Sequence, residues 1–399
     1  MFPGPPEISH TAVSLDKAED GIPRGIIITA KSKEIYVMDE NEQILQRMMN
    51  LTSRRLQHIQ LKEQYRILKE LGSGSYGQVL QAEHKLQGNV MALKLMKKTK
   101  TKKDNFLMEY CVSLCLASHP NIIGTFAVAF ETNKYFSFGQ ELATAGDLYS
   151  ITVPKVGLPE TVVKRCAMQL AEALDFMHSK ALVHRDVKLD NVLIFDDACH
   201  CIKLADFGLT RLEGFLASPM KGVLPYSPPE LCNLEDNETL ELDSSLDVWS
   251  FGVLLFCISS GFFPWDTAMS KDKQYAEFVN WQCTGDDHKI PSQWKQFTRQ
   301  ALIMFHRLLA INPNRRSPAI EIQKYLSVPW KINSLKDNSN IQANSNNTEH
   351  RADNMNFLQD TSSSHMSTKH FSMPSDRKLS VTASAADISE DIDQDSITQ

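Results

Sequence analysis

The stretch LVHRDVKLDNVLIF, residues 182–195, restricts more than any other segment how this chain can fold. Both of its ends are apolar, which predicts two buried strands, at residues 182–183 and 192–195. The loop between them carries four charged or amide side chains: Arg185, Asp186, Lys188 and Asn191. Burying charged groups is costly unless each has a partner. We therefore expect a highly charged ligand to visit this loop.

Size and composition limit the class of protein. A chain of 399 residues exceeds one ordinary core, which favours two lobes or one domain with tails. The net charge of -6 argues against binding to nucleic acid or to a membrane surface. The start of the chain does not resemble a signal peptide, and the longest apolar stretch, residues 251–259, is too short for membrane insertion. Eight cysteines without a pairing pattern predict reduced thiols in a cytoplasmic protein, and we prefer this to a metal site at the CHC triplet.

The apolar pattern divides the chain into three parts. Residues 1–64 form an N-terminal extension, which we expect to be partly disordered and to contain one amphipathic helix between residues 40 and 60. The apolar residues at helical spacing in it, which would pack against the following domain, are Ile44, Met48, Leu51 and Leu56. Residues 65–330 are dense in apolar segments. Residues 331–399 are rich in Ser, Asn, Asp and Gln and are predicted to be disordered.

Two styles of secondary structure follow one another in the dense region. Residues 65–145 read as short strands with one helix, at residues 105–117. Residues 159–330 are mainly helical, and the helix near 246–261 is apolar almost all round, as expected for a buried helix. Strands first and helices second predict a bilobal α+β fold with a cleft between a small β-rich lobe and a larger helical lobe.

A glycine-rich segment, LGSGSYGQV at residues 71–79, lies between two predicted strands. Its glycines, Gly72, Gly74 and Gly77, would let backbone N–H groups approach a phosphate chain, although a mobile hairpin explains a lone G-x-G-x-x-G equally well. A strand follows where a dinucleotide-binding fold needs a helix, so that alternative is rejected. Lys94, on the next strand, can reach the phosphates, and Glu109 on the following helix can hold its ammonium by ion pairing.

Downstream of the charged loop, Asp206 ends a predicted strand and is followed by Phe207 and Gly208. The Asp206 carboxylate and the Asn191 amide are hard oxygen ligands for Mg²⁺ on a polyphosphate. Each feature alone is ambiguous, but their combination in this order is specific.

Together these motifs resemble those of eukaryotic protein kinases over residues 65–330. They comprise the glycine-rich segment, Lys94, His184-Arg185-Asp186, Asn191, Asp206-Phe207-Gly208, Glu230 of a Pro-Glu pair, DVWSFGV at residues 247–253, and Arg316. By this resemblance Arg316 pairs with Glu230. Segments such as NFLMEYCVSL and ELATAGDLYS are similar to the SH3-domain-binding kinase family of serine/threonine kinases.

The resemblance implies a protein serine/threonine kinase that uses ATP and Mg²⁺. Asp186 would accept or orient the substrate hydroxyl proton and Lys188 would neutralise the transferred phosphoryl group, while Asn191 and Asp206 would hold Mg²⁺. The expected ATP-binding residues are Leu71, Gly72, Ser73, Gly74, Ser75, Tyr76, Gly77, Gln78, Val79 and Lys94. At the adenine end the resemblance implies roles for Gln140, Glu141, Ala143 and Asp147.

The chain departs from the family at Val223, where most serine/threonine kinases have a threonine that hydrogen-bonds the catalytic aspartate and lysine. Losing that bond predicts a slower enzyme, and the alternative is a pseudokinase scaffold that binds nucleotide with little turnover. Arg185 and Arg211 suggest a pocket for a phosphate on Ser218, with an ordinary loop serine as the equal alternative.

Partners are predicted only in outline. We expect protein substrates and a monomeric chain. PGPP at residues 3–6 fits P-x-x-P but has no arginine beside it, and the tail contains only Pro374, which argues against SH3 binding despite the family's name.

Overall fold

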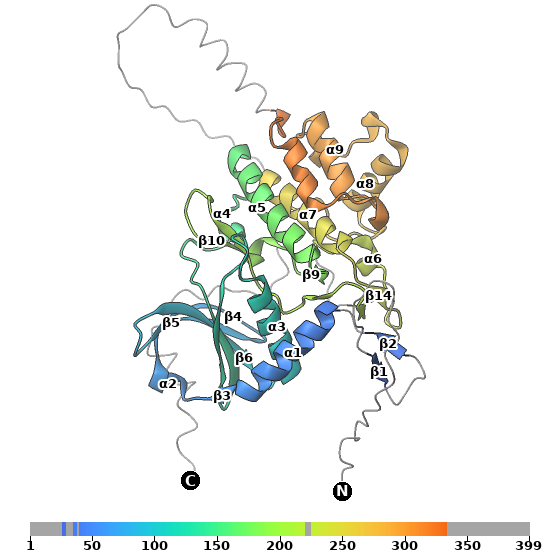
Figure 1. Cartoon of the computed structure of the whole chain (residues 1–399). Coiled ribbons are helices and arrows are strands. Elements are labelled where there is room, and N and C mark those ends of the chain that lie inside the picture. The colour runs from blue at the N-terminus through green and yellow to red at the C-terminus, as the bar shows by residue number, and fades with distance from the viewer. Residues whose placement is uncertain (1–25, 29–34, 38–39, 220–224, 333–399) are drawn as a thin grey trace, which may run out of the picture.

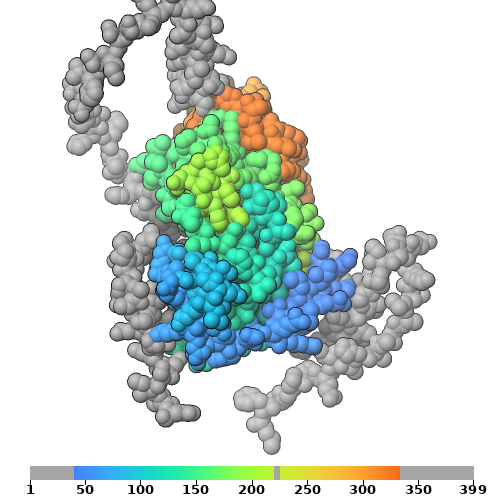
Figure 2. Space-filling view, turned by 60° about the vertical axis from the view of Figure 1, so that its left-hand side comes forward, coloured from blue at the N-terminus to red at the C-terminus, as the bar shows by residue number. Residues whose placement is uncertain are grey.

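The computed structural model describes residues 26–28, 35–37, 40–219 and 225–332. Figure 1 shows two lobes, a small one built on a β-sheet and a larger one built from helices. In the space-filling view of Figure 2 the small lobe is blue to teal, and the large lobe runs from green to orange. The predicted α+β bilobal fold is confirmed.

The small lobe is organised around one six-stranded sheet with the order β3-β7-β8-β6-β5-β4. Its strands are β3 (Gln57–His58), β4 (Tyr65–Gly74), β5 (Gly77–His84), β6 (Val90–Lys97), β7 (Thr125–Glu131) and β8 (Tyr135–Gln140). All neighbours are antiparallel except β3 and β7. β6 therefore lies in the middle of the sheet, where both of its edges are paired and its backbone is held firmly. We did not predict β7 as a strand.

Helices flank the sheet. The short α2 (Leu61–Gln64) leads into β4, and α3 (Lys103–Leu116) connects β6 to β7. Before the sheet, α1 (Glu40–Arg55) packs against α3 (Figure 1). A helix packed against the following domain was predicted, and two of the four predicted packing residues, Met48 and Leu56, are partly buried against the core. The prediction was wrong for the other two. Leu45 and Met49 are the buried residues, whereas Ile44 and Leu51 are about half exposed.

The large lobe contains the remaining helices: α4 (Leu148–Ile151), α5 (Glu160–His178), α6 (Pro229–Cys232), α7 (Ser245–Ser260), α8 (Lys273–Thr284) and α9 (Arg299–Leu308), together with short 3₁₀ segments. Every residue of α7 from Leu246 to Ser260 is buried. This agrees with its uniformly apolar sequence, because a helix surrounded by others has no solvent face to fill with polar residues. The helix ends at Gly261, whose left-handed backbone is the usual helix C-cap.

Two-stranded antiparallel pairs shape the side of the large lobe that faces the sheet. They are β9 (Leu182–Val183) with β12 (Arg211–Leu212), β10 (Val192–Ile194) with β11 (Ile202–Leu204), and β13 (Leu216–Ala217) with β14 (Leu240–Glu241). A further pair, β1 (Ile26–Ile28) with β2 (Ile35–Val37), precedes α1. Of the two strands flanking the charged loop, β9 has the predicted bounds and β10 ends one residue earlier than predicted.

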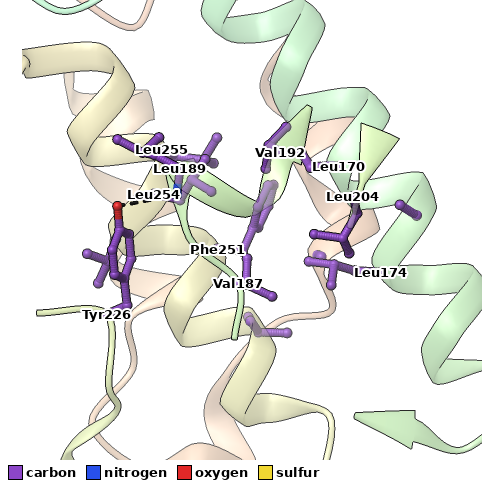
Figure 3. Packing of buried hydrophobic residues seen from close by; sticks show 14 of the residues in the cluster. Leu170, Leu174, Val187, Leu189, Val192, Leu204, Tyr226, Phe251, Leu254 and Leu255 are labelled. Atoms are coloured by element: carbon purple, nitrogen blue, oxygen red, sulfur yellow. Dashed lines mark hydrogen bonds between the residues drawn. The ribbon is translucent and has the colours of Figure 1, made fainter. Parts of the chain in front are cut away.

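The charged loop rests on the hydrophobic core of the large lobe (Figure 3). Val187 and Leu189, which alternate with the charged residues, lie in a hydrophobic cluster with residues of α5, α7, β10 and β11. Both are almost fully buried. The Tyr226 hydroxyl lies 3.4 Å from the Leu189 nitrogen, from which it accepts a hydrogen bond. These apolar residues thus anchor the loop to the core of the large lobe. Within the described part of the chain, no helix is both long and apolar enough to cross a membrane.

Candidate active site

The glycine-rich segment forms the turn between β4 and β5. Ser73 pairs with Gln78 and Gly74 with Gly77, which leaves Ser75 and Tyr76 at the tip. Gly77 is required by close packing, because a Cβ there would lie 1.9 Å from the Leu95 carbonyl oxygen. At Gly72 and Gly74 an added Cβ would meet nothing within 4 Å. Those two glycines leave open space in which a ligand can approach the backbone.

Lys94 lies at the centre of β6, opposite Val79 on one side and Phe138 on the other. Its Nζ is 2.6 Å from Glu109 Oε1, on α3, and 2.8 Å from Asp206 Oδ1. The predicted ion pair between Lys94 and Glu109 is therefore present. One ammonium joins the sheet, helix α3 and the segment after β11.

Electrostatics stabilise the charged forms of Lys94 and Asp206, whereas burial raises the pKa of Glu109 although the Lys94 charge opposes this. The Lys94 ammonium holds the pKa of Asp206 well below its usual range, although burial opposes this. Burial alone would lower the pKa of Lys94, but the charges of Asp206 and Glu109 outweigh burial and raise it. Lysine and aspartate are therefore both charged at neutral pH, as phosphate and metal binding require.

The hairpin of β10 and β11 brings Asn191 and Asp206 together. In this antiparallel pair Val192 lies opposite Leu204, so the residue before β10 and the residues after β11 are at the same end. The Ala205 N–H donates to the Asn191 carbonyl at 2.8 Å, which joins the two segments directly. Sequence positions 191 and 206 thus become neighbours in the cleft.

Asp186 lies in the same place and accepts hydrogen bonds from two neighbours. Lys188 Nζ is 2.9 and 2.7 Å from its two carboxylate oxygens. Asn191 Nδ2 donates to the carboxylate and to the backbone carbonyl of Asp186, each at 2.8 Å. These contacts orient the Asp186 carboxylate.

A buried carboxylate with no role predicted from the sequence, that of Asp247, holds the charged loop against α7. Asp247, on α7, accepts hydrogen bonds from the backbone N–H groups of His184 and Arg185, both at 2.8 Å, and lies 2.9 Å from His178 Nε2. Burial would raise the pKa of Asp247, but the hydrogen bond and charge of His178 and the other donors keep it below its usual range. Arg185 has a φ of 71°, a strained conformation that these contacts maintain. The signal for this role was a single acid in an otherwise apolar helix, because such a charge needs buried partners.

The segment after β8 lies at the other end of the cleft, where adenine was predicted to bind. Gln140 ends β8, and the Glu141 N–H donates to the Gly124 carbonyl at 2.9 Å. The Glu141 side chain is also engaged, since Lys203 Nζ is 2.6 Å from it. Asp147 caps α4 by accepting a hydrogen bond from the Ser150 N–H at 2.8 Å. Adenine and ribose contacts from this segment stay predictions.

The residues present fit a magnesium-bound nucleotide. The Asp206 side chain is 46 % exposed and uses Oδ1 for Lys94, which leaves Oδ2 for a cation. The hydrogen bonds described for the Asn191 side chain all use its amide nitrogen, which leaves the amide oxygen as a second ligand. Carboxylate and amide oxygens are the donor set that Mg²⁺ prefers. The open space beside Gly72 and Gly74 supplies room for a phosphate chain.

The segment that ends at Glu230 is fixed by the predicted ion pair. Arg316 and Glu230 form a bidentate pair with distances of 2.6 and 2.8 Å, and the Arg316 side chain is fully buried. Its guanidinium carbon also lies 4.9 Å from the centre of the Trp249 ring. The prediction that Arg316 pairs with Glu230 is confirmed.

The proposed phosphate pocket is only partly described. Ser218 is exposed. Arg185 and Arg211 donate to backbone carbonyls, those of Leu209 and Thr210 among them, and the Arg185 Nε is buried without a partner in the described part of the chain. Val223 lies outside the described residues, so its effect on Asp186 stays a prediction.

Comparison with known proteins agrees with the resemblance to protein kinases. The family described as protein kinase domain matches residues 65–330. Serine/threonine-protein kinase SBK1 of Danio rerio is 46 % identical over 297 residues, which cover 74 % of this chain and 76 % of that protein. SBK1 of Mus musculus is 48 % identical over 279 residues, 70 % of this chain and 67 % of that protein. SBK2 of Homo sapiens is 38 % identical over 325 residues, which cover 81 % of this chain and 92 % of that protein. This chain belongs to the protein kinase family, and within it to the SH3-domain-binding serine/threonine kinases.

Proposed function

We propose that this chain transfers the γ-phosphoryl group of ATP to serine or threonine hydroxyls of proteins, using the residues that meet in the cleft. The observation that carries the proposal is the position of Lys94, which contacts both Glu109 and Asp206. This arrangement joins the small lobe to the metal-binding carboxylate and is the one required for phosphoryl transfer in kinases.

Each residue has a role that follows from its contacts. The glycine-rich hairpin, residues 71–79, covers the phosphates with its backbone, and Lys94 binds their oxygens. Asn191 and Asp206 hold Mg²⁺, which neutralises charge on the phosphates when bound. Asp186, oriented by Asn191, accepts the proton of the substrate hydroxyl. Lys188 lies within 2.9 Å of Asp186 and can contact the transferred phosphoryl group from the same position.

The experiment compares ATP turnover on a peptide library by the wild type and by Asp186→Asn. Substituting the general base is expected to lower kcat by about 10²- to 10⁴-fold, because that is the usual contribution of a positioned base. Asp197→Asn, an exposed carboxylate in the β10–β11 turn, is the matched control and is expected to retain wild-type kcat. Nucleotide affinity is measured in parallel.

The second candidate is a pseudokinase scaffold, and Val223 is the feature that favours it. A wild-type chain that binds ATP·Mg²⁺ but phosphorylates neither itself nor any peptide would establish the scaffold and refute the enzyme. Intact Lys94, Asp186, Asn191 and Asp206 support the enzyme.

We also propose a monomeric protein of the cytoplasm that does not depend on SH3 domains. All eight cysteines are free thiols, as in proteins of reducing compartments. The PGPP segment and the tail, which concern SH3 binding, lie outside the described residues. Light scattering and cell fractionation test the first two statements, and an SH3-domain array tests the third.

A further inference from the structure

Helix α1 lies outside the segment that matches the kinase domain, yet it is packed against the helix that carries Glu109. Leu45 and Met49 of α1 are 6 % and 8 % exposed and belong to the same core cluster as Leu107 and Cys111 of α3. Figure 1 shows α1 beside α3, to the right of α3 and of the sheet in this view. A segment outside the domain thus completes the burial of a helix inside it.

Two sulfur contacts define how the helices run. Met48 Sδ is 3.4 Å from Cys115 Sγ, and Thr52 Oγ1 is 3.7 Å from Cys111 Sγ. As the residue number rises by four on α1 it falls by four on α3, so the helices are antiparallel and meet over at least one full turn of each.

The stripe of α3 that faces α1 lies opposite Glu109. Cys111 and Cys115 are one turn apart and therefore share a face. Glu109 precedes Cys111 by two residues, which places it about 200° away at roughly 3.6 residues per turn. On the far side Glu109 meets Lys94 at 2.6 Å. Helix α1 thus packs on one side of α3, and the ion pair between Glu109 and Lys94 lies on the other side.

The sequence of α3 explains why this helix must be packed on the side that faces α1. Its buried residues lie all round the helix, including Phe106, which stacks on Phe136 of the sheet, and Cys111 on the opposite side. A helix packed only on the sheet would be polar on its outer face. Without α1, the apolar stripe of α3 would face water. Rotating or shifting α3 would then lower the free energy by burying that stripe again.

We propose that α1 is an internal positioning element for catalysis, in which Leu45 and Met49 hold α3 in the orientation that lets Glu109 fix Lys94. Neither residue touches substrate, so both act through Glu109. The inference rests on the proposed function for its catalytic consequence but not for the packing.

The test uses the full chain with Leu45→Ala and Met49→Ala combined. The matched control is Ile44→Ala combined with Leu51→Ala on the same helix, residues that are 50 % and 47 % exposed. The core pair is expected to lower kcat/KM for ATP by about tenfold or more, and the control pair to change it by less than about twofold. Equal effects of the two pairs would overturn the proposal.

A double-mutant cycle separates positioning from general stability. If α1 acts through Glu109, the core pair added to Glu109→Gln lowers kcat/KM by no more than a further factor of about two, because the ion pair is already lost. The full tenfold loss in both backgrounds would show that α1 acts elsewhere and would refute the proposal. Replacing Met49→Ala by Met49→Leu in the core pair restores an apolar side chain of similar size. The resulting variant is expected to have the same kcat/KM as Leu45→Ala alone.

Thiol labelling reports the packing independently of turnover. In the core pair, Cys111 and Cys115 are expected to react with a maleimide about tenfold faster than in the wild type, while Cys257, buried in α7, stays protected. Unchanged labelling at Cys111 would refute the packing role, and equal labelling at Cys257 would show global unfolding and also count against it. Should the wild type show no turnover, the proposed function fails, whereas labelling and nucleotide affinity still decide the role of α1.

Discussion

The clearest quantitative consequence of the structure concerns Asp247, which holds the charged loop to α7. Its carboxylate is fully buried and accepts hydrogen bonds from two backbone N–H groups, those of His184 and Arg185, at 2.8 Å. Asp247→Ala leaves both N–H groups without their acceptor in a fully buried site. Each such loss costs about 1–3 kcal/mol, so for the two groups together we expect the free energy of unfolding to fall by about 2–6 kcal/mol.

Activity should fall with stability, because the same contacts maintain the left-handed backbone of Arg185 next to Asp186. A displacement of the base by about 1 Å lowers the rate by about 10²-fold. Urea unfolding at 25 °C and kcat with saturating ATP measure the two effects. Asp243→Ala is the control, since Asp243 caps the start of the same helix through Ser245 N and should cost about 1 kcal/mol. A loss below about 1 kcal/mol for Asp247→Ala, with kcat within twofold of the wild type, would refute the anchoring argument.

The same residue predicts a pH dependence. The folded-state pKa of Asp247 lies below its unfolded value of about 4, so its contribution to stability is present above about pH 4 and is lost as pH falls through the folded pKa. The difference in unfolding free energy between the wild type and Asp247→Asn should therefore shrink below about pH 4. A constant difference from pH 6 to the acid limit of folding would contradict this assignment.

Three further predictions concern the segment that follows Asp206. Arg316→Ala should lower the free energy of unfolding by about 3–5 kcal/mol, because it leaves a paired carboxylate alone in a buried site, whereas Arg307→Ala, at a half-exposed pair, should cost less than about 1 kcal/mol. Denaturant titration compares the two, and similar losses would be inconsistent with the role of burial. Val223→Thr should raise kcat about 5- to 150-fold by restoring one hydrogen bond worth about 1–3 kcal/mol, and an unchanged rate would show that Asp186 is positioned without it. Ser218→Ala should lower the activity of protein isolated from cells about tenfold if a phosphate there binds the nearby guanidiniums, and mass spectrometry with phosphatase treatment checks the modification. Full activity of the variant would exclude it.

Much of the site was predictable because its residues belong to short local patterns. The glycine hairpin, the lysine of β6 and the aspartate after β11 are each recognisable from neighbouring residues, and their order along the chain made the combination specific. The pair of Lys94 with Glu109 was expected from these motifs, and the pair of Arg316 with Glu230 from the resemblance to protein kinases; both are present.

Features that depend on partners distant in sequence were missed or wrongly assigned. Strand β7 was overlooked because its sequence, TFAVAFE, is short and does not distinguish strand from helix. The buried face of α1 was predicted only in part, because both faces of that helix carry apolar residues: Met48 packs against the core as expected, but Leu45 and Met49 are buried in place of Ile44 and Leu51. Asp247 stands in a recognisable motif, but the backbone N–H groups that donate to it, those of His184 and Arg185, lie more than sixty residues away.

The sequence by itself determined which chemical groups this protein has and in what order they occur, because periodicity, glycine spacing and isolated buried charges are local properties of the chain. Only the tertiary structure decided which groups meet. Antiparallel pairing of β10 with β11 brought Asn191 beside Asp206, and packing of α1 against α3 buried Leu45 and Met49. Such contacts form because segments far apart in the sequence bury each other's surfaces, and no single stretch of sequence specifies its distant partner.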